Sequence, residues 1–365
     1  MAEDRLARYR AIRDFEATPE PAGAPGPPPE GSSRFVVQEH HATSLHWDLR
    51  LERGGTLASW AVPKGIPVDP ATNHLAVRTE DHPLEYLVFA GEIPGGNYGA
   101  GRMGVWDHGS YELVKWTERE VMVVLHGERV SGRYVLFRTG GTQWMIHRMD
   151  PPEDPGRQRF PGWGAFAPML AEPGPMPDAA DLERYAFEVD WGGVRAFAHV
   201  EGGRIGVRVP GRDGEQIRLL PELRALGASL GATEVVLDGD LVVVGAGGRP
   251  DTARLADRLT PRSDAAARRL ARAAPVTYLI VDVLWVEGRP LMDLAYDERR
   301  RRLEDLGLSG PAWQVPPSHP GEGPALAAAA AAQGLPGVIA KERASRYRAG
   351  PAGSAWISVR TSPPA

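Results

Sequence analysis

The sequence predicts a multidomain protein in which an all-β barrel is followed by a mixed α/β domain. Between Arg34 and about Met149, short apolar runs alternate with glycine-containing turns, and helical periodicity is nearly absent, a pattern typical of a β-barrel. Residues 151–164 are rich in proline, glycine and charge, as interdomain linkers often are. Strand-like and helix-like segments alternate beyond them, so we expect the barrel at 34–150, a linker at 151–165 and the second domain at 166–365.

The chain begins with a charged segment, residues 3–14, that predicts a short helix. It continues to residue 33 as a proline- and glycine-rich extended arm. In the second half, apolar runs predict strands at 187–189, 196–200, 235–244 and 277–286. Helical spacing predicts helices at 221–230, 264–274, 297–306 and 323–333.

Length and composition restrict the possible functions. A chain of 365 residues is long enough for two domains with separate cores. Its formal charge of -5 gives no global basic footprint, so any contact with nucleic acid must be local. Cysteine is absent, which excludes disulfides, thiolate catalysis and cysteine-type zinc sites. The sequence shows no signal peptide and no apolar run of membrane-spanning length, so we expect a cytoplasmic, nucleoid-associated protein without a membrane partner.

A strict alternation of polar and apolar residues begins at Leu45. The polar set is His46, Asp48, Arg50 and Glu52, and the apolar set is Leu45, Trp47, Leu49 and Leu51. This alternation predicts a strand with one buried face and all its reactive side chains on the other. Two imidazoles, His40 and His46, can form an open metal site with the Asp48 carboxylate. Arg50 is a planar fork suited to two phosphate oxygens. The alternative is an ordinary solvated outer face.

Two further segments hold reactive side chains in constrained surroundings. His82 lies in EDHPLEY (80–86), where several acid–base groups precede a glycine-rich turn. Lys64 lies between a proline and a glycine in SWAVPKG (59–65). Alone, either residue is more often structural than functional. Together with residues 40–50 they supply metal ligands, cations and a proton donor, a combination suited to attack on a phosphate ester.

Five segments resemble, in order, the 3′-phosphoesterase domain of bacterial DNA ligase D. They are FVVQEH (35–40), LHWDLRLE (45–52), SWAVPKG (59–65), EDHPLEY (80–86) and GNYGAG (96–101). The match runs from the arm to about Met149. It implies a β-barrel with a divalent-metal site, usually manganese, that trims a 3′-terminal ribonucleoside from a primer strand and removes 3′-phosphates.

The resemblance also implies roles for individual residues. The implied metal ligands are His40, His46 and Asp48, the implied phosphate-holding groups are Arg50 and His82, and the implied assisting groups are Lys64 and Tyr86. Other functional positions of the family are matched by Arg13, Asp14, Glu20, Gln38 and Glu80. Since three of these precede the barrel, we expect the arm to fold back over the site. Two departures are His74, where the family often has arginine, and Glu39, where lysine is common. We expect weaker or pH-shifted phosphate binding from the first and a less basic site mouth from the second.

Residues 166–360 resemble the adenylation domain of ATP-dependent DNA ligases, which implies an α+β nucleotidyltransferase fold. The matching segments are APMLA (167–171), FEVDWGGVRA (187–196), LDGDLV (237–242), VDVLW (281–285), GVIAK (337–341) and WISVR (356–360). Adenylation needs a lysine amine that attacks the α-phosphate of ATP. The family places that lysine at the position that Asp190 occupies here.

Other positions of the ligase motifs also depart from the family. The replacements are Gly192 for an aspartate, Asp240 and Pro336 for glutamates, and Ser358 with Arg360 for a final basic pair; the residues Arg195, Arg212 and Lys341 are retained. No lysine lies between Lys115 and Lys341, and a carboxylate at position 190 repels a triphosphate. We therefore expect a pseudo-ligase domain with doubtful ATP binding and a residual role in DNA or partner binding. Few residues follow the last motif, so we also expect no OB-fold module in this chain.

These features predict a metal-dependent 3′-phosphoesterase that processes DNA ends in double-strand break repair, fused to a ligase-like domain without ligase activity. The expected cofactor is manganese, and the expected substrates are DNA 3′ ends, including RNA-tipped ones. Candidate partners are a Ku-like protein and separate polymerase or ligase subunits. One alternative is a non-catalytic DNA-end-binding or repair-complex adaptor, which would show no metal-dependent turnover. Another is a working ATP-dependent DNA ligase, which would form a covalent adenylate.

Overall fold

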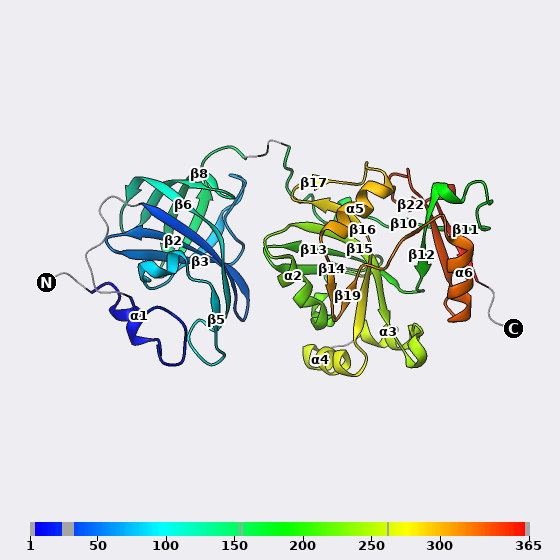
Figure 1. The fold of residues 1–365 in the computed structure, drawn as a ribbon, viewed down its shortest axis with the longest axis horizontal. Helices are drawn as coiled ribbons and strands as arrows, with labels where there is room; N and C mark the ends of the chain where they lie inside the picture. The colour runs from blue at the N-terminus through cyan, green and yellow to red at the C-terminus, as the bar shows by residue number, and fades with distance from the viewer. Residues whose placement is uncertain (1–3, 24–32, 153, 155, 261–262, 362–365) are drawn as a thin grey trace. The chain divides into compact units, whose positions relative to one another are not determined.

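The chain folds as two compact units, residues 1–155 and 156–365 (Figure 1). The structure, a computed structural model, describes residues 4–23, 33–152, 154, 156–260 and 263–361. The predicted arm therefore lies partly outside the described residues, which exclude 24–32. None of the helices in the described part of the chain is long and apolar enough to cross a membrane.

The first unit is a closed barrel of eight antiparallel strands, with a ninth short strand attached to it. The strands are β1 (Arg34–His41), β2 (Leu45–Arg53), β3 (Thr56–Val62), β4 (His74–Arg78), β5 (Gly91–Ile93), β6 (Gly101–Trp116), β7 (Glu120–Gly127), β8 (Ser131–Gly140) and β9 (Gln143–Arg148). They pair in the order β1-β2-β3-β4-β9-β8-β7-β6, and β1 pairs with β6 to close the ring. The short β5 pairs with β6. The prediction of an all-β barrel is confirmed.

The N-terminal segment packs on the barrel through a helix shorter than predicted. The prediction covered 3–14, whereas α1 spans Ala7–Ala11, and in Figure 1 it lies beside the barrel (blue). The helix ends at Ala11, and Arg13, two residues later, forms a buried ion pair with Glu20 of the arm. Tyr9 of α1 is fully buried, in a cluster that includes side chains of the barrel and of the 3₁₀ helix η1 (Leu84–Leu87). The segment is therefore part of the folded unit.

The second unit contains two main sheets and a short parallel pair. The first sheet has the order β11 (Glu172–Pro173), β23 (Trp356–Arg360), β21 (Gly337–Glu342), β12 (Tyr185–Asp190) and β20 (His319–Pro320). The second has the order β14 (Arg204–Arg208), β13 (Val194–Glu201), β15 (Val235–Val243), β16 (Val276–Val286), β19 (Trp313–Gln314) and β18 (Ser309–Gly310), with β17 (Arg289–Pro290) paired to β16. The parallel pair is β10 (Met169–Leu170) with β22 (Gly350–Pro351). All four predicted strands are present, within β12, β13, β15 and β16.

Helices complete the second unit. They are α2 (Arg224–Leu230), α3 (Thr252–Arg258), α4 (Asp264–Ala273), α5 (Tyr296–Asp305) and α6 (Gly323–Ala332), with 3₁₀ helices η2 (Trp163–Ala165), η3 (Leu182–Arg184), η4 (Ile217–Leu219), η5 (Pro221–Leu223), η6 (Ala246–Gly248) and η7 (Gly353–Ala355). Four of the α-helices lie where predicted. The helix α3, with seven residues, was not predicted from the sequence. Its start is marked by Asp251, which accepts a hydrogen bond from the backbone nitrogen of Arg254 at 2.9 Å.

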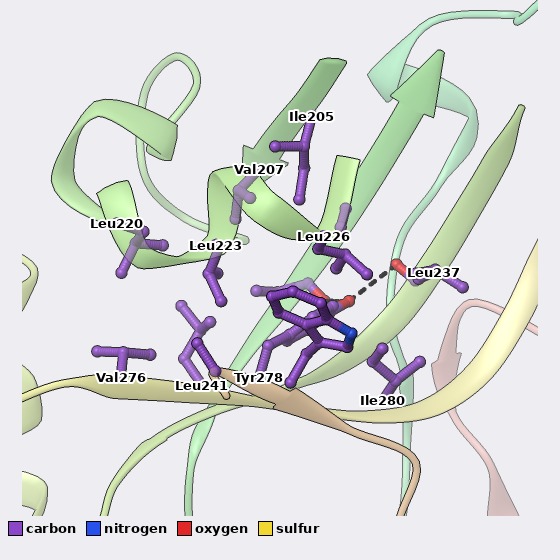
Figure 2. Close-up of a cluster of buried hydrophobic side chains, with 14 of the residues drawn as sticks. Ile205, Val207, Leu220, Leu223, Leu226, Leu237, Leu241, Val276, Tyr278 and Ile280 are labelled. Carbon is purple, nitrogen blue, oxygen red and sulfur yellow. Dashed lines mark hydrogen bonds between the residues drawn. The ribbon is translucent and has the colours of Figure 1, made fainter. Parts of the chain in front are cut away.

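An aliphatic core holds the larger sheet of the second unit together. Figure 2 shows side chains of β14, η5, α2 and the central strands β15 and β16 gathered around Tyr278. The Tyr278 hydroxyl contacts the carbonyls of Ala196 (3.0 Å) and Leu237 (3.1 Å), so its polar atom is satisfied inside the core. Tyr278 thereby links the three neighbouring strands β13, β15 and β16.

Candidate active site

The β1–β2 hairpin fixes the relative positions of the predicted metal ligands. His40 lies directly opposite His46, and Gln38 lies opposite Asp48. Since side chains alternate between the faces of a strand, His40, His46 and Asp48 project from the same face. Their ligand atoms all lie within 4.8 Å of one another. Among the described residues, this group of His, Cys, Asp or Glu side chains is close enough together to hold a metal ion.

Hydrogen bonds and burial prepare the histidines for a cation. Nδ1 of His46 donates to the carbonyl of Ser44 at 3.0 Å, which leaves Nε2 as the lone-pair nitrogen, 3.7 Å from Oδ1 of Asp48. Nδ1 of His40 lies 3.7 Å from Oδ2 of Asp48. Nε2 of His40 is buried and has no hydrogen-bond partner within the described structure. Two imidazoles and a carboxylate are a donor set that suits a first-row divalent ion, so these residues fit a metal.

Arg50 keeps Asp48 ionised and presents an open donor. Burial would raise the pKa of the Asp48 carboxyl, but the charge of Arg50, helped by the two histidines, holds that pKa well below its usual range. Nη2 of Arg50 donates to Oδ2 of Asp48 at 2.9 Å, and Nε donates to Oε1 of Gln38 at 2.7 Å. The remaining nitrogen, Nη1, is buried without a hydrogen-bond partner in the described part of the chain. Such a nitrogen is a ready donor for an anion such as phosphate.

The N-terminal arm adds buried charges to the same face. Nε of Arg13 donates to Oε1 of Glu20 at 2.8 Å, and Nη1 of Arg13 lies 2.7 Å from Oε1 of Glu80. None of the three side chains is more than 4% exposed. Burial opposes the charged guanidinium, but the two carboxylates outweigh it and raise the pKa of Arg13. The prediction that the arm folds back over the site is confirmed for Arg13 and Glu20.

His82 is buried and neutral. Burial, followed by the charges of Arg50 and Arg13, lowers the pKa of His82 well below its ordinary value. Nδ1 of His82 donates to the backbone carbonyl of Glu80 at 2.9 Å, so Nε2 carries the lone pair and accepts from Nη2 of Arg13 at 3.2 Å. The imidazole is thus held between the arm and the barrel.

Tyr86 and Gln38 hold the other polar groups in place. The Tyr86 hydroxyl donates to Oε1 of Glu20, and the Arg50 guanidinium lies over the Tyr86 ring, 4.8 Å from its centroid. Burial, then Glu20, raises the pKa of Tyr86, so the phenol stays protonated. Nε2 of Gln38 donates to the carbonyls of Tyr86 (3.0 Å) and Phe89 (2.8 Å). These bonds fix the side chain whose oxygen accepts from Arg50.

The side chains meet in one cavity of about 210 Å³. The predicted site residues that line it are Arg13, Glu20, His40, His46, Asp48, Arg50, Glu80, His82 and Tyr86. Asp14 and Lys64 are exposed and are not part of this lining. Asp14 accepts a hydrogen bond from the backbone nitrogen of Glu16 at 3.1 Å, within the turn after α1. Lys64 lies in the connection between β3 and β4.

In the second unit, a carboxylate occupies the position that the resemblance to ligases assigns to the nucleophilic lysine. Asp190 ends β12, and its Oδ1 accepts a hydrogen bond from the backbone nitrogen of Gly192 at 2.9 Å. Gly192 has a φ of +60°, and a Cβ built there would lie 3.1 Å from Cγ of Pro336. An aspartate at position 192 would therefore require both backbone strain and a shift of Pro336.

The retained basic residues of the second unit are engaged in internal contacts. Nζ of Lys341 donates to Oε2 of Glu188 at 2.9 Å and to the carbonyl of Val281 at 3.3 Å. This lysine is 2% exposed, and its burial lowers the pKa of the amine although Glu188 opposes the shift. Arg195 pairs with Asp238 at 2.5 Å and lies 3.8 Å from Asp240, whose own pKa is raised by burial.

Two family models match the chain. Residues 38–138 match the family described as DNA Ligase D 3′-phosphoesterase domain, and residues 168–360 match the ATP dependent DNA ligase domain. The chain belongs to the ATP-dependent DNA ligase domain family. A DNA ligase D 3′-phosphoesterase domain precedes the ligase domain in the chain. This assignment agrees with the order of the barrel and of the α+β unit in the fold.

Curated relatives of the ligase D type match both units. The Multifunctional non-homologous end joining DNA repair protein LigD of Mycobacterium tuberculosis is 40% identical over 359 residues, which are 97% of this chain and 45% of the relative. The LigD of Pseudomonas aeruginosa is 35% identical over 405 residues, with coverage of 97% and 47%. The chain thus spans less than half the length of these relatives. A solved structure of the ligase domain from M. tuberculosis LigD is 32% identical, covers 55% of this chain and 62% of its own, and superposes with a TM-score of 0.46.

His74 and Glu39, the two departures from the ligase D phosphoesterase pattern, are not among the residues that line the cavity. Nδ1 of His74 is 2.7 Å from the carbonyl of Gly65, and Nε2 of His41 is 2.7 Å from Oε1 of Glu39. Tyr98, by contrast, lines the cavity although it was not predicted as a site residue. Its position in the GNYGAG segment (96–101), one of the five motifs, was the available signal.

Proposed function

We propose that the first unit is a divalent-metal-dependent 3′-phosphoesterase that removes 3′-terminal ribonucleosides and 3′-phosphates from DNA ends in double-strand break repair. The observation that carries this proposal is that one cavity contains both a candidate cation site and a donor for an anion. His40, His46 and Asp48 form a cation site with ligand atoms within 4.8 Å, and the open Nη1 of Arg50 lies beside it. Hydrolysis of a phosphate ester benefits from both, because cationic groups neutralise the phosphate oxygens while a nucleophile attacks the phosphorus.

The metal would be held by His40, His46 and Asp48, and we propose manganese. When bound, a divalent ion of this kind supplies Lewis-acid polarisation of a phosphate oxygen and lowers the pKa of a water molecule. The mixed nitrogen and oxygen donor set is compatible with manganese. The low pKa of Asp48 favours binding, since the ligand carboxylate is already ionised.

The protein's own groups position the substrate. Arg50 donates from Nη1 to a phosphate oxygen, while Gln38 and Asp48 hold the rest of its guanidinium. Arg13, fixed by the two carboxylates Glu20 and Glu80, adds a second cation at the cavity wall. The Tyr86 phenol keeps its proton and orients Glu20. Lys64 and Asp14 lie outside the cavity lining, and the roles proposed for them rest on the resemblance to the family.

His82 is assigned to the scissile phosphate as a neutral imidazole. Its Nδ1 proton is committed to a backbone carbonyl, so its Nε2 lone pair is the reactive atom. This atom is held by Arg13 in the absence of substrate. His82 thereby helps Glu20 and Glu80 to fix the Arg13 guanidinium at the cavity wall.

We propose that the second unit does not adenylate. Asp190 replaces the attacking amine, and the buried Lys341 is bound to Glu188. The unit keeps the ligase fold and would serve in DNA or partner binding, with ATP as a doubtful ligand. The LigD relatives are named for non-homologous end joining, which supports a place for the whole protein at broken DNA ends.

The test is turnover by the full chain. A primer–template whose 5′-labelled primer ends in one ribonucleotide, and a matched primer with a 3′-phosphate, are incubated with manganese or with EDTA. We expect shortened or dephosphorylated product in the presence of manganese and no such product in the presence of EDTA. Arg50→Ala should reduce the rate by about 100-fold or more, whereas Arg119→Ala, on the exposed β6–β7 turn, should not. If the wild-type chain leaves both substrates unchanged with metal present, the adaptor alternative replaces this proposal.

A further inference from the structure

Tyr98 is an aromatic side chain at the opening of the cavity, and it has no part in the proposed binding of metal and phosphate. Two tyrosines line this cavity, and they differ in exposure: Tyr86 is 1% exposed, whereas Tyr98 is 53% exposed. The Tyr86 ring already carries the Arg50 guanidinium. Tyr98 therefore offers aromatic surface to a molecule that enters from solvent.

Two backbone turns flank Tyr98, and a cation lies over its ring. Asn97 donates to the carbonyl of Pro94 at 3.3 Å and Ala100 donates to the carbonyl of Asn97 at 3.2 Å, which makes a compact turn on each side of the tyrosine. The Arg13 guanidinium lies over the ring, 5.2 Å from its centroid. Burial, then the charge of Glu80, raises the pKa of the Tyr98 hydroxyl. Arg13 thus connects the Tyr98 ring to the charged groups of the cavity.

The cavity is too small for a complete nucleotide. Its volume of about 210 Å³ is below the range of roughly 300–1,000 Å³ typical of pockets that enclose a drug-sized ligand. The deepest groups are buried, with Arg50 2% and Asp48 5% exposed. A scissile phosphate must enter the cavity to reach them, and this draws the terminal nucleoside out of the base stack. The unstacked base then remains at the rim, where proteins commonly bind bases on aromatic rings.

We propose that Tyr98 stacks on the base of the 3′-terminal ribonucleoside and selects for the nucleoside-removing step. This inference rests on the proposed phosphoesterase function. In that step, a water oxygen forms a bond to phosphorus, the bond from phosphorus to O5′ of the terminal nucleoside breaks, and the nucleoside leaves with a proton on O5′. Removal of a 3′-phosphate breaks the bond from phosphorus to O3′ of the strand, and no nucleoside lies beyond the phosphate. Tyr98 should matter only for the first reaction.

The experiment compares three primers on one template with the full chain and manganese. The first ends in a ribonucleotide, the second in a 3′-phosphate and the third in a ribose that lacks its base. Tyr98→Ala should slow removal of the ribonucleoside roughly tenfold, the scale of one base–aromatic stack, and leave 3′-phosphate removal unchanged. The wild type should be slowed by a similar factor on the baseless ribose, and Tyr98→Ala should not slow it further. Tyr98→Phe, which keeps the ring, should retain the wild-type rate on all three.

The outcomes separate this inference from the proposed function. Equal slowing of the first two reactions by Tyr98→Ala would overturn the inference, because it would place Tyr98 on the retained strand or on the phosphate. A wild-type rate for Tyr98→Ala on the ribonucleotide primer would overturn it as well. Retained 3′-phosphate removal shows that the variant is folded. If the wild type removes neither group, the phosphoesterase proposal itself is wrong.

Discussion

Arg13 donates a hydrogen bond from Nε to Oε1 of Glu20 at 2.8 Å, and neither side chain is more than 4% exposed. Both residues precede the barrel in sequence, yet both line the cavity that contains the candidate metal ligands His40, His46 and Asp48. Glu20 also accepts from Tyr86 of the barrel unit. The arm is therefore a wall of the site, and its removal changes the electrostatics of the buried groups.

Replacement of Arg13 by alanine should impair both activity and stability. The change leaves Glu20 and Glu80 as buried carboxylates without their cation, which typically costs about 3–5 kcal/mol. We expect the rate on both substrates to fall by about 100-fold or more. The matched control is Arg10→Ala, because the Arg10 side chain is 40% exposed and pairs with Asp4 at the surface. Full activity in a folded Arg13→Ala protein would show that the arm is a passive cover.

Replacement of His46 by alanine should remove the metal site. One ligand of three is lost, so we expect the affinity for manganese, measured by calorimetry, to fall by at least about 10–100-fold. A loss of this size is typical when a residue that only hydrogen-bonds to a metal ligand is replaced. The wild type should also gain thermal stability with manganese, because a ligand that binds the folded state stabilises it. His126→Ala is the control, since His126 is exposed and pairs with Glu112. Unchanged affinity in His46→Ala would exclude the triad as the site.

Stability should depend on pH through His82. Burial, then Arg50 and Arg13, lowers its pKa in the folded state, whereas the unfolded chain takes up a proton near pH 6.5. The unfolded state then binds more protons, so stability is lost as the pH falls below about 6.5 and is fully present above it. The slope from this one group is limited to about 1.4 kcal/mol per pH unit. Urea titrations between about pH 5 and 7.5 give the free energy of unfolding at each pH. This free energy should depend less steeply on pH for His82→Asn than for the wild type, and an identical pH dependence would contradict the low pKa of His82.

The purified protein should not form a covalent adenylate. Asp190 holds the position of the nucleophile, and a carboxyl–AMP anhydride is far more labile than a lysine phosphoramidate. Asp190→Lys alone should also fail, because Gly192, Pro336 and Ser358 remove groups that bind sugar, metal or phosphate in the family. The assay is incubation with labelled ATP followed by a denaturing gel. A labelled band that is sensitive to acid but stable to base would contradict this prediction and would implicate Lys341.

Much of the barrel site was predictable because period-two alternation sorts side chains by face. His46, Asp48 and Arg50 follow directly from that rule, and the β1–β2 register adds His40. The prediction that only one face of this strand is buried was wrong: Asp48 and Arg50 are 5% and 2% exposed. The reason is tertiary, since the arm and η1 cover the polar face, and strand periodicity contains no information on what covers it.

Contacts between distant segments limited the other predictions. The roles implied for Arg13 and Glu20 came from resemblance, because their pairing across the site depends on how the arm folds back. Tyr98 was missed since a tyrosine between glycines indicates only a turn, and its exposure at the cavity follows from the path of that turn. In the second unit the strands were predictable from apolar runs, but the Lys341–Glu188 pair joins residues 153 positions apart.

The connection between β1 and β2 limits which insertions and deletions the hairpin can accept. Three residues, 42–44, separate the paired positions His41 and Leu45. Loss or gain of one residue here would shift β2 by one position, and a one-residue slip turns every side chain to the opposite face. The Trp47 side chain would then lie on the face that the Asp48 carboxylate now occupies. Insertions and deletions in this hairpin are therefore changes that would erase the chemistry while every reactive side chain is still encoded.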